Sequence, residues 1–274
     1  MRFAVCARPD REPAMRAGAG ATAYLRAAGH EVAAVSLDSR TLEDEVGNAE
    51  VACVFGGDGT MLRAARALAP LGVALLGVNL GRLGFLSGTT VDGFERTIVD
   101  VAAGRYETED RTLLDARLWR GDEEAVHVLA LNDVVVARGE FVRSIHLDVR
   151  IDGEPFTVYW SDGLIVATAT GSTAYGFSVG GPLILPHSRA FMMVPIAPHL
   201  SFGNAVVLER DQMLSFGVLD EPARLSCDGQ EEHALRVGDR IEVCRSATVA
   251  RFVRTATMPP FLSLLRQKIL KEGN

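Results

Sequence analysis

The sequence contains almost no lysine: Lys268 and Lys271 are the only two among 274 residues. Lys and Arg together number 28 against 35 Asp and Glu, which gives a formal net charge of -7. A lysine that cradles phosphate in a glycine-rich loop is therefore excluded over most of the chain, and any cationic side chain that contacts phosphate there must be Arg. The acidic balance also disfavours nucleic acid and anionic membranes as partners.

Cysteines and long apolar runs are scarce as well. Cys6, Cys53, Cys227 and Cys244 lie far apart, unlike the paired cysteines of a zinc site or a redox motif. Such cysteines are typical of buried side chains in a reducing compartment. No apolar run approaches the roughly 20 residues of a membrane span, and the N-terminal apolar stretch is too short for a signal peptide. We therefore expect a cytoplasmic protein, and no metal-ligating cluster, because the histidines are scattered too.

The first hundred residues alternate short apolar runs with helix-like stretches, which predicts an α/β domain with a parallel, Rossmann-like sheet. The expected strands cover residues 3–7, 32–37, 51–55 and 73–78, and the expected helices residues 11–28, 41–47, 60–69 and 91–103. We place this domain at residues 1–104.

From Tyr106 onward, strand-like segments and turns replace the helical pattern, which predicts a mostly antiparallel β domain at residues 105–257. The expected strands are residues 113–119, 126–136, 145–151, 157–160, 212–218, 223–227, 240–244 and 248–253. A last helix is expected over residues 260–271, where apolar residues recur at helical spacing. We expect residues 258–274 to pack back on the first domain.

The strongest local motif is Gly56-Gly57-Asp58-Gly59-Thr60, directly after an apolar run and before a helix-like stretch. Glycines let the backbone turn sharply and approach a ligand, and the amides of a helix start favour phosphate. Asp58 would lie at the carboxyl end of a strand, where open α/β sheets bind ligands. A plain tight turn with Asp58 as a helix cap is the alternative.

Two further motifs carry polar groups in apolar surroundings. Residues 168–175, Thr-Ala-Thr-Gly-Ser-Thr-Ala-Tyr, offer many hydrogen-bonding groups and the Tyr175 ring. Asn132-Asp133 interrupts a strand-like run, and two such side chains are costly unless they have partners. Each motif has a structural alternative, namely an ordinary loop and a sheet residue pair. Asp228-Gly229-Gln230 is weaker still, since Asp-Gly is also an ordinary hairpin turn.

In this order and spacing, these motifs resemble those of the NAD kinases. The resemblance includes Asp162-Gly163-Leu164, Gly180-Gly181-Pro182 and Leu83-Gly84-Phe85, and it spans almost the whole chain. Diglyceride and sphingosine kinases share the glycine-aspartate-glycine element, but the Thr-Gly-Ser-Thr-Ala-Tyr element distinguishes the NAD kinases from them. Ala169, where the family usually has proline, and Trp160-Ser161 before Asp162 depart from the family pattern.

The resemblance implies transfer of a phosphoryl group from ATP or inorganic polyphosphate to the 2′-hydroxyl of the adenosine ribose of NAD. Asp58 would be the general base. The first domain would be the donor side, with a phosphate site formed by Gly56, Gly57, Gly59, Thr60 and Arg63. Mg²⁺ or another divalent cation would neutralise much of the phosphate charge, because the motif carries no lysine.

The resemblance also implies a set of NAD-binding residues, centred on the second domain. Asn132 and Asp133 would hold the ribose, Asp162 the nicotinamide end, and Phe85 would pack near the adenine. The remaining members of this set would be Asp58, Gly59, Thr170, Thr173, Ala174, Tyr175, Ser178, Ala197 and Gln230.

Two other functions fit parts of the pattern. A diglyceride-type lipid kinase would need an acyl cleft or a basic amphipathic helix, for which the sequence gives no sign. A module that senses NAD or NADP without catalysis would not need a positioned base such as Asp58. The NAD kinase resemblance further implies a homodimer or homotetramer, whose order the sequence does not determine.

Overall fold

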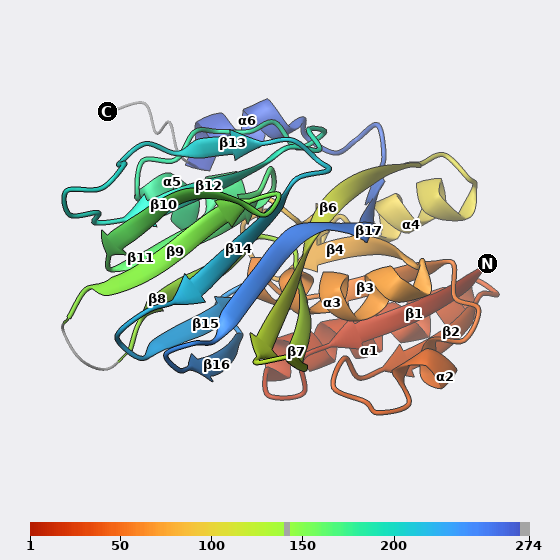
Figure 1. Cartoon of the computed structure of the whole chain (residues 1–274). Helices are drawn as coiled ribbons and strands as arrows, with labels where there is room; N and C mark the ends of the chain where they lie inside the picture. The colour runs from red at the N-terminus through yellow and green to blue at the C-terminus, as the bar shows by residue number, and fades with distance from the viewer. Residues whose placement is uncertain (140–142, 269–274) are drawn as a thin grey trace. The chain divides into compact units, whose positions relative to one another are not determined.

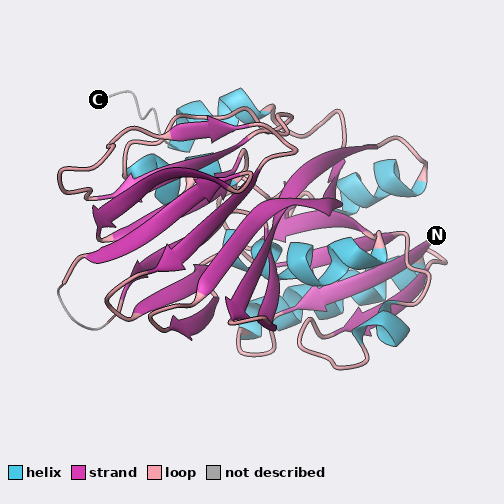
Figure 2. Ribbon diagram, in the orientation of Figure 1, coloured by secondary structure: helices cyan, strands magenta, loops and turns pink. Residues whose placement is uncertain are grey.

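The computed structural model describes residues 1–139 and 143–268 and divides them between two compact units (Figure 1). The first unit comprises Met1–Asp110 and the segment that begins at Ala250, and the second comprises Arg111–Val249. Figure 2 shows that most of the helices belong to the first unit, whereas strands make up most of the second. Among the described residues, no helix is both long and apolar enough to cross a membrane.

The first unit is built around a parallel sheet. Its strands are β1 (Arg2–Ala7), β2 (Glu31–Val35), β3 (Val51–Phe55), β4 (Ala74–Asn79) and the short β5 (Thr89–Thr90). They pair in the order β4-β3-β1-β2, all parallel, and the last part of β17 (Arg240–Arg254) joins β4 at Phe252. All five residues of β3 are buried, as expected for a strand covered on both faces.

The helices of this unit follow the sequence prediction closely. They are α1 (Glu12–Ala27), α2 (Leu42–Val46), α3 (Asp58–Leu68), the short η1 (Ala69–Leu71), α4 (Phe94–Ala102) and α6 (Phe261–Lys268). Two starts differ from prediction: α3 begins two residues earlier, at Asp58, and α4 three residues later than expected. Residues 269–271 of the predicted last helix lie outside the described residues. Aromatic residues Phe3, Phe55 and Phe94 belong to the core of the unit.

The second unit contains two antiparallel layers that share one core. One layer has the order β13-β12-β11-β8-β15-β16, and the other contains β10-β9-β14 and the first part of β17. Leu147 and Phe216 from one layer pack in the same cluster as Val136 and Leu164 from the other. The bounds of these strands, and of β6 and β7, which pair with each other, are β6 (Glu107–Arg120), β7 (Glu123–Ala130), β8 (Asp133–Arg138), β9 (Ile145–Ile151), β10 (Glu154–Ser161), β11 (Gly163–Thr168), β12 (Phe191–Ile196), β13 (Val206–Leu208), β14 (Met213–Val218), β15 (Ala223–Cys227) and β16 (Glu231–Leu235).

The fold prediction of a parallel α/β domain followed by a mostly antiparallel β domain is confirmed, and so is the return of the C-terminal helix to the first unit. The predicted strand over residues 126–136 is wrong. The chain turns at Leu131 and Asn132, so that β7 pairs with β6 while β8 pairs with β11 and β15. The strands predicted at 240–244 and 248–253 form the single β17. β12, β13 and β16 were not predicted.

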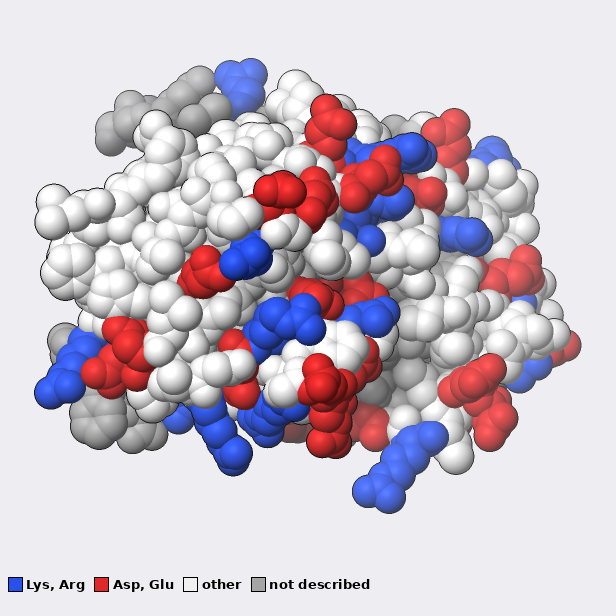
Figure 3. Space-filling model, in the orientation of Figure 1, with Lys and Arg blue, Asp and Glu red and all other residues white. Residues whose placement is uncertain are grey.

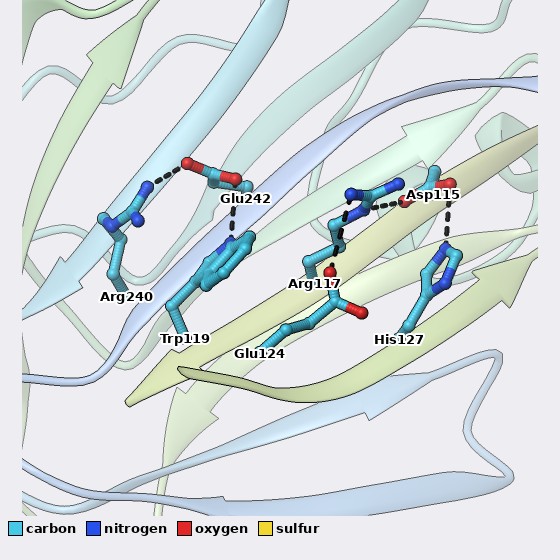
Figure 4. A network of polar contacts seen from close by, with 7 residues as sticks. All are labelled: Asp115, Arg117, Trp119, Glu124, His127, Arg240 and Glu242. Carbon is cyan, nitrogen blue, oxygen red and sulfur yellow. Dashed lines mark hydrogen bonds and ion pairs between the residues drawn. The ribbon is translucent and has the colours of Figure 1, made fainter. Parts of the chain in front are cut away.

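The outer surface of β6, β7 and β17 carries a network of charged and aromatic side chains (Figure 4). The indole Nε1 of Trp119 donates to Glu242 at 2.8 Å, and the Arg240 guanidinium lies 5.5 Å from the centre of the indole. Asp115 contacts both Arg117, at 3.1 Å, and His127, at 2.9 Å. On the face shown in Figure 3, cationic and anionic side chains intermix instead of forming a patch of one sign.

Candidate functional site

The glycine turn predicted from the sequence links β3 to α3 in the first unit. Gly57 caps α3, and its carbonyl accepts the N–H groups of Thr60 at 2.9 Å and Met61 at 3.2 Å. A β-carbon on Gly56 would lie 2.3 Å from Oγ1 of Thr60, so the turn admits no side chain there. The turn thus presents the N-terminus of a helix, a structure suited to phosphate.

Asp58 lies in the first turn of α3 with its carboxylate oriented by a neighbouring loop. The N–H of Phe85 donates to Oδ2 at 3.0 Å, and the N–H of Leu86 donates to Oδ1 at 3.2 Å. A β-carbon on Gly84 would lie 1.9 Å from Oδ1, which explains a glycine next to Phe85. A carboxylate has about four acceptor positions. The two that Phe85 and Leu86 occupy fix its orientation and leave capacity for a substrate hydroxyl.

Two other predicted residues of this unit contact protein groups. Arg63 forms an ion pair with Asp38 at 3.1 Å on the surface, so a donor phosphate would have to compete with Asp38 for its guanidinium. The ring of Phe85 packs 6.1 Å from that of Phe261, and Lys268 Nζ lies 5.2 Å from the centre of the same ring. Phe85 thus helps to hold α6.

The second unit contains a cavity of about 380 Å³ at the end of β8. It is lined by four of the residues predicted to bind NAD, Asn132, Asp133, Ala174 and Tyr175, and by Val135, Ser226, Asp228 and Gly229. Tyr175 is 44% exposed, so one face of its ring is accessible to a ligand. Three motifs that are far apart in the sequence therefore meet around one cavity.

The turn that follows β11 forms one wall of this cavity. Thr170 precedes the short η2 (Gly171–Thr173), and its carbonyl accepts the hydroxyl of Thr173 at 3.1 Å. The guanidinium of Arg111, a buried residue, reaches Oγ1 of Thr170 at 3.4 Å. Ser178 ends the short α5 (Tyr175–Ser178) and is exposed. Hydroxyl–carbonyl contacts therefore shape this turn.

Asp133 is a buried carboxyl group beside a second one. It is 6% exposed, and its pKa is raised to about 7, first by burial and second by the negative charge of Asp228. The Asp228 carboxylate accepts the N–H groups of Leu131, Asn132 and Asp133 at 3.0, 2.7 and 3.2 Å. Three N–H donors stabilise the ionised form of a carboxylate, so Asp133 is the member of the pair that keeps its proton.

The other predicted NAD-binding residues are not in the lining of this cavity, and three of them, Asp162, Ala197 and Gln230, lie apart from the turn that follows β11. Asp162 precedes β11 and Ala197 follows β12, which places both at the opposite end of the sheet from Thr170. The six residues of β11 span about 20 Å, at about 3.3 Å per residue. Asp162 is instead paired with Arg138 at 3.5 Å. Gln230 is exposed, and its N–H donates to the carbonyl of Cys227 at 3.1 Å.

Sequence reasoning missed Thr168, Arg111 and Asp228 as contributors to the site. Asp228 belongs to one of the motifs that carry the resemblance, but the motif indicated no role for it beyond an ordinary hairpin turn, and it does have the positive φ, 53°, of such a turn. The sequence feature that could have indicated a buried Asp228 is its neighbour Cys227, an apolar residue that places the aspartate next to the core. For Arg111 the sequence gives no signal, because nothing in a strand of mixed polarity marks one arginine as buried.

Metal-ligating residues do not cluster in the described part of the chain: no group of three His, Cys, Asp or Glu is close enough to hold an ion. Three histidines instead pair with carboxylates: His127 with Asp115, His146 with Asp220 and His233 with Glu231.

Comparison with known proteins assigns most of the chain to one family of enzymes. Residues 21–106 match the model of the ATP-NAD kinase N-terminal domain, and residues 131–255 that of the ATP-NAD kinase C-terminal domain. An NAD kinase of Moorella thermoacetica is 42% identical over 233 residues, 84% of this chain and 74% of the relative. One of Aromatoleum aromaticum is 40% identical over 228 residues, 82% and 76% of the two chains.

Two solved structures resemble the fold. An NAD kinase from Archaeoglobus fulgidus in complex with ATP aligns over all of both chains, with a TM-score of 0.76 and 27% identity. A yeast NADH kinase complexed with NADH aligns over all of this chain and 89% of its own, with a TM-score of 0.88 and 24% identity. The family matches distinguish this chain from lipid kinases that share only the glycine-aspartate-glycine turn. By its sequence along both units and by its fold, the chain belongs to the NAD kinase family.

Proposed function

We propose that this chain transfers the terminal phosphoryl group of ATP to the 2′-hydroxyl of the adenosine ribose of NAD and so produces NADP. The observation that carries the proposal is the carboxylate of Asp58, held by two backbone N–H groups at the start of a helix. Phosphoryl transfer requires mainly positioning and charge neutralisation, and no covalent nucleophile. A fixed carboxylate beside a phosphate-binding helix start meets the first requirement.

Asp58 acts in this proposal as the general base. The ribose oxygen attacks the terminal phosphorus of ATP, the bond from that phosphorus to the bridging oxygen breaks, and ADP leaves with the bonding electrons. Asp58 accepts the proton of the ribose hydroxyl and later releases it to water. The amides of Phe85 and Leu86 keep the carboxylate in place throughout.

We assign the donor side of the reaction to the first unit and the NAD side mainly to the second. The backbone of Gly56, Gly57, Gly59 and Thr60 would bind the donor phosphates, with Arg63 recruited from its surface pair with Asp38. Support for ATP as donor comes from the Archaeoglobus relative, whose structure contains ATP. Inorganic polyphosphate presents the same kind of terminal phosphoryl group and remains a candidate donor.

We propose Mg²⁺ as the accompanying cation, held mainly by the phosphate oxygens of the donor. This arrangement fits a chain whose described residues lack a three-ligand cluster, because Mg²⁺ in kinases takes only one or two protein carboxylates. Asp58 is the carboxylate that the glycine turn offers. The bound ion would neutralise charge on the phosphates, a role for which this turn has no lysine.

On the NAD side, Asn132 and Asp133 would hold the ribose in the cavity while the Tyr175 ring stacks on an aromatic base. An amide, a carboxyl group and an exposed ring are suited to those contacts. The pocket would be closed by Thr170, Thr173, Ala174 and Ser178, with Gln230 at its rim and Phe85 near the adenine.

The position of Asp162 and Ala197 leads us to propose that a second copy of the chain completes the NAD site. Both residues lie at the Gly163 end of β11, about 20 Å from its Thr168 end, and neither lines the cavity of its own chain. The surface for self-association would be β10, an edge strand on which Phe156, Val158 and Trp160 are exposed at every second position. The area over β10 and β13 in Figure 3 shows few charged side chains.

Mixing variants tests the shared site. Asp162→Ala and Asn132→Ala, each impaired alone, should regain activity when refolded together, because one site in the mixed oligomer then has both side chains. Light scattering would establish that mixed oligomers form. Mixed oligomers without regained activity would place both residues in one chain or remove Asp162 from the site.

We also propose that the enzyme works in the cytoplasm. Its cysteines are free thiols, and Cys6, Cys53 and Cys227 are buried, as in proteins of reducing compartments.

The activity test measures NADP formation from NAD and Mg²⁺, with ATP in one reaction and polyphosphate in another, using an NADP-specific dehydrogenase. Product with ATP supports the proposal, and product with polyphosphate widens the donor class. A folded protein that binds NAD but forms no product with either donor would instead be an NAD-sensing module.

A further inference from the structure

The chain turns from β7 into β8 at Leu131 and Asn132, and buried side chains hold both sides of this corner. On the N–H side, the carboxylate of Asp228 accepts three successive backbone amides, those of Leu131, Asn132 and Asp133. The N–H of Asp228 in turn donates to the carbonyl of Asp133 at 2.9 Å. Four hydrogen bonds therefore join one aspartate to three consecutive residues.

On the carbonyl side, Thr168 makes the matching contacts. Its hydroxyl donates to the carbonyl of Leu131 at 2.6 Å, and its backbone N–H donates to the carbonyl of Asn132 at 2.9 Å. The same hydroxyl accepts the N–H of Gly171 at 3.1 Å, and the Thr168 side chain is fully buried. A β-carbon on Gly171 would lie only 2.0 Å from the Asn132 carbonyl oxygen, so this side of the corner is tightly packed.

These contacts are local to the corner and do not belong to the strand ladders. A buried carboxylate is costly unless its oxygens accept hydrogen bonds, and three amide donors meet that need only while the corner keeps its present shape. Asn132 and Asp133 are the corner residues that line the cavity. Fixing their backbone therefore fixes the direction in which their side chains enter it.

We propose that Asp228 and Thr168 are positioning residues that hold the Leu131–Asn132–Asp133 corner in the conformation that presents Asn132 and Asp133 to the NAD ribose. This inference rests on the proposed function for the identity of the ligand, but the hydrogen bonds that carry it do not. Neither residue needs to touch NAD in this role.

Asp228 has a second effect that Thr168 lacks. Burial is the main reason why the neutral form of Asp133 is favoured, and the negative charge of Asp228 acts in the same direction. Other charged groups at this end of the sheet are Arg111, whose guanidinium contacts Thr170, Glu231, which pairs with Cys227, and Arg189, two residues before Phe191 of β12. A neutral Asp133 can donate a hydrogen bond to a ribose oxygen, whereas an ionised one can only accept. Asp228 thereby positions the corner and also adds to the rise in the pKa of Asp133 that burial causes.

The test compares Asp228→Asn, Thr168→Val and the conservative Thr168→Ser with the wild type. Asp228→Asn and Thr168→Val should each lower kcat/KM for NAD by about a hundredfold, the size expected for a displaced binding group, with KM for ATP little changed. Thr168→Ser keeps the hydroxyl and should retain most of the activity. Asp220→Asn is the matched control, because Asp220 also accepts backbone amides but lies on the surface away from the cavity.

A pH profile separates positioning from a merely structural role. If KM for NAD follows the ionisation of Asp133, its inflection near pH 7 should move to lower pH in Asp228→Asn. It should stay in place in Thr168→Val, which leaves the charge of Asp228 unchanged. The same shift in both variants, or in neither, would overturn the electrostatic part of the proposal.

Hydrogen exchange tests the corner without any activity. The amides of Leu131, Asn132 and Asp133 should exchange about tenfold faster in Asp228→Asn, while those of β3 keep their protection and show that the variant is folded. Unchanged exchange at the corner would overturn the proposal even if the wild type makes NADP. Faster exchange with no NADP formed by the wild type would leave the corner established and refute the proposed function instead.

Discussion

A β-carbon on Gly84 would lie 1.9 Å from Oδ1 of Asp58, well inside contact distance. The loop that supplies the two N–H donors to Asp58 can therefore approach the carboxylate only because residue 84 has no side chain. The Asp58 carboxylate and the loop that orients it therefore depend on each other, and replacing the glycine should disturb both.

We expect Gly84→Ala to lower kcat by about a hundredfold, because the new methyl group must push the Asp58 carboxylate or the Phe85 amide out of place. Steady-state NADP formation measures this effect. Gly81→Ala, three residues earlier, is the matched control, since a β-carbon there meets nothing within 4 Å. Equal kcat in the two variants would contradict the proposed arrangement.

Asp58→Asn should bind NAD but lose about 10²- to 10⁴-fold in kcat, the usual contribution of a general base. The asparagine is nearly the same size, so the turn and the cavity of the second unit should survive. Calorimetric titration with NAD verifies binding, and the coupled assay measures turnover. Turnover equal to that of the wild type would remove Asp58 from the chemical step.

Tyr175→Ala should weaken NAD binding by about 1 to 3 kcal/mol, the value of a base stacked on an aromatic ring. Phe177→Ala serves as the control, because Phe177 is similarly exposed but does not line the cavity. Titration with NAD gives both affinities. If the two variants bind NAD equally well, Tyr175 is not part of the pocket.

The buried Asp133 should make stability depend on pH. Its pKa is raised from 3.8 to about 7 in the folded chain, so between these values the unfolded chain releases a proton that the folded chain keeps. The free energy of unfolding should then fall as pH rises through this window, by up to about 1.4 kcal/mol per pH unit. The stability that the neutral carboxyl contributes is complete below pH 3.8 and is lost as pH rises toward 7.

Urea unfolding at pH 5 and pH 7.5 measures this slope against Asp133→Asn, which cannot ionise. The difference in unfolding free energy between wild type and variant should shift in favour of the variant at the higher pH. A difference that is the same at both values would mean that Asp133 titrates near its ordinary pKa.

Much of the fold could be predicted from local sequence. Parallel strands such as β3 are continuous apolar runs because both faces are buried, and helices such as α1 begin and end near breakers, Pro13 at the start and Gly29 at the end. The corner between β7 and β8 was missed because apolar residues flank Asn132 and Asp133 on both sides. What ends the strand is Asp228, 95 residues further along the chain.

The chemistry of the site was likewise only partly available from the sequence. Asp58 could be recognised because the glycines, the strand and the helix that position it are its neighbours. The pairing of Arg63 with Asp38, the contact of Phe85 with Phe261, and the distance of Asp162 from the cavity depend on residues brought together by folding.

The sequence by itself determined the family, the order of the two domains and the choice of Asp58 as the proposed base, because these depend on short motifs and on apolar periodicity. Only the tertiary structure decided which hydrogen bonds hold the side chains of the site and which of its carboxyl groups keeps a proton. It placed Asp228 and Thr168 on opposite sides of one corner, and it buried Asp133 beside a second carboxylate. Hydrogen-bond geometry and desolvation depend on which groups are close in space, and separation along the chain does not set that proximity.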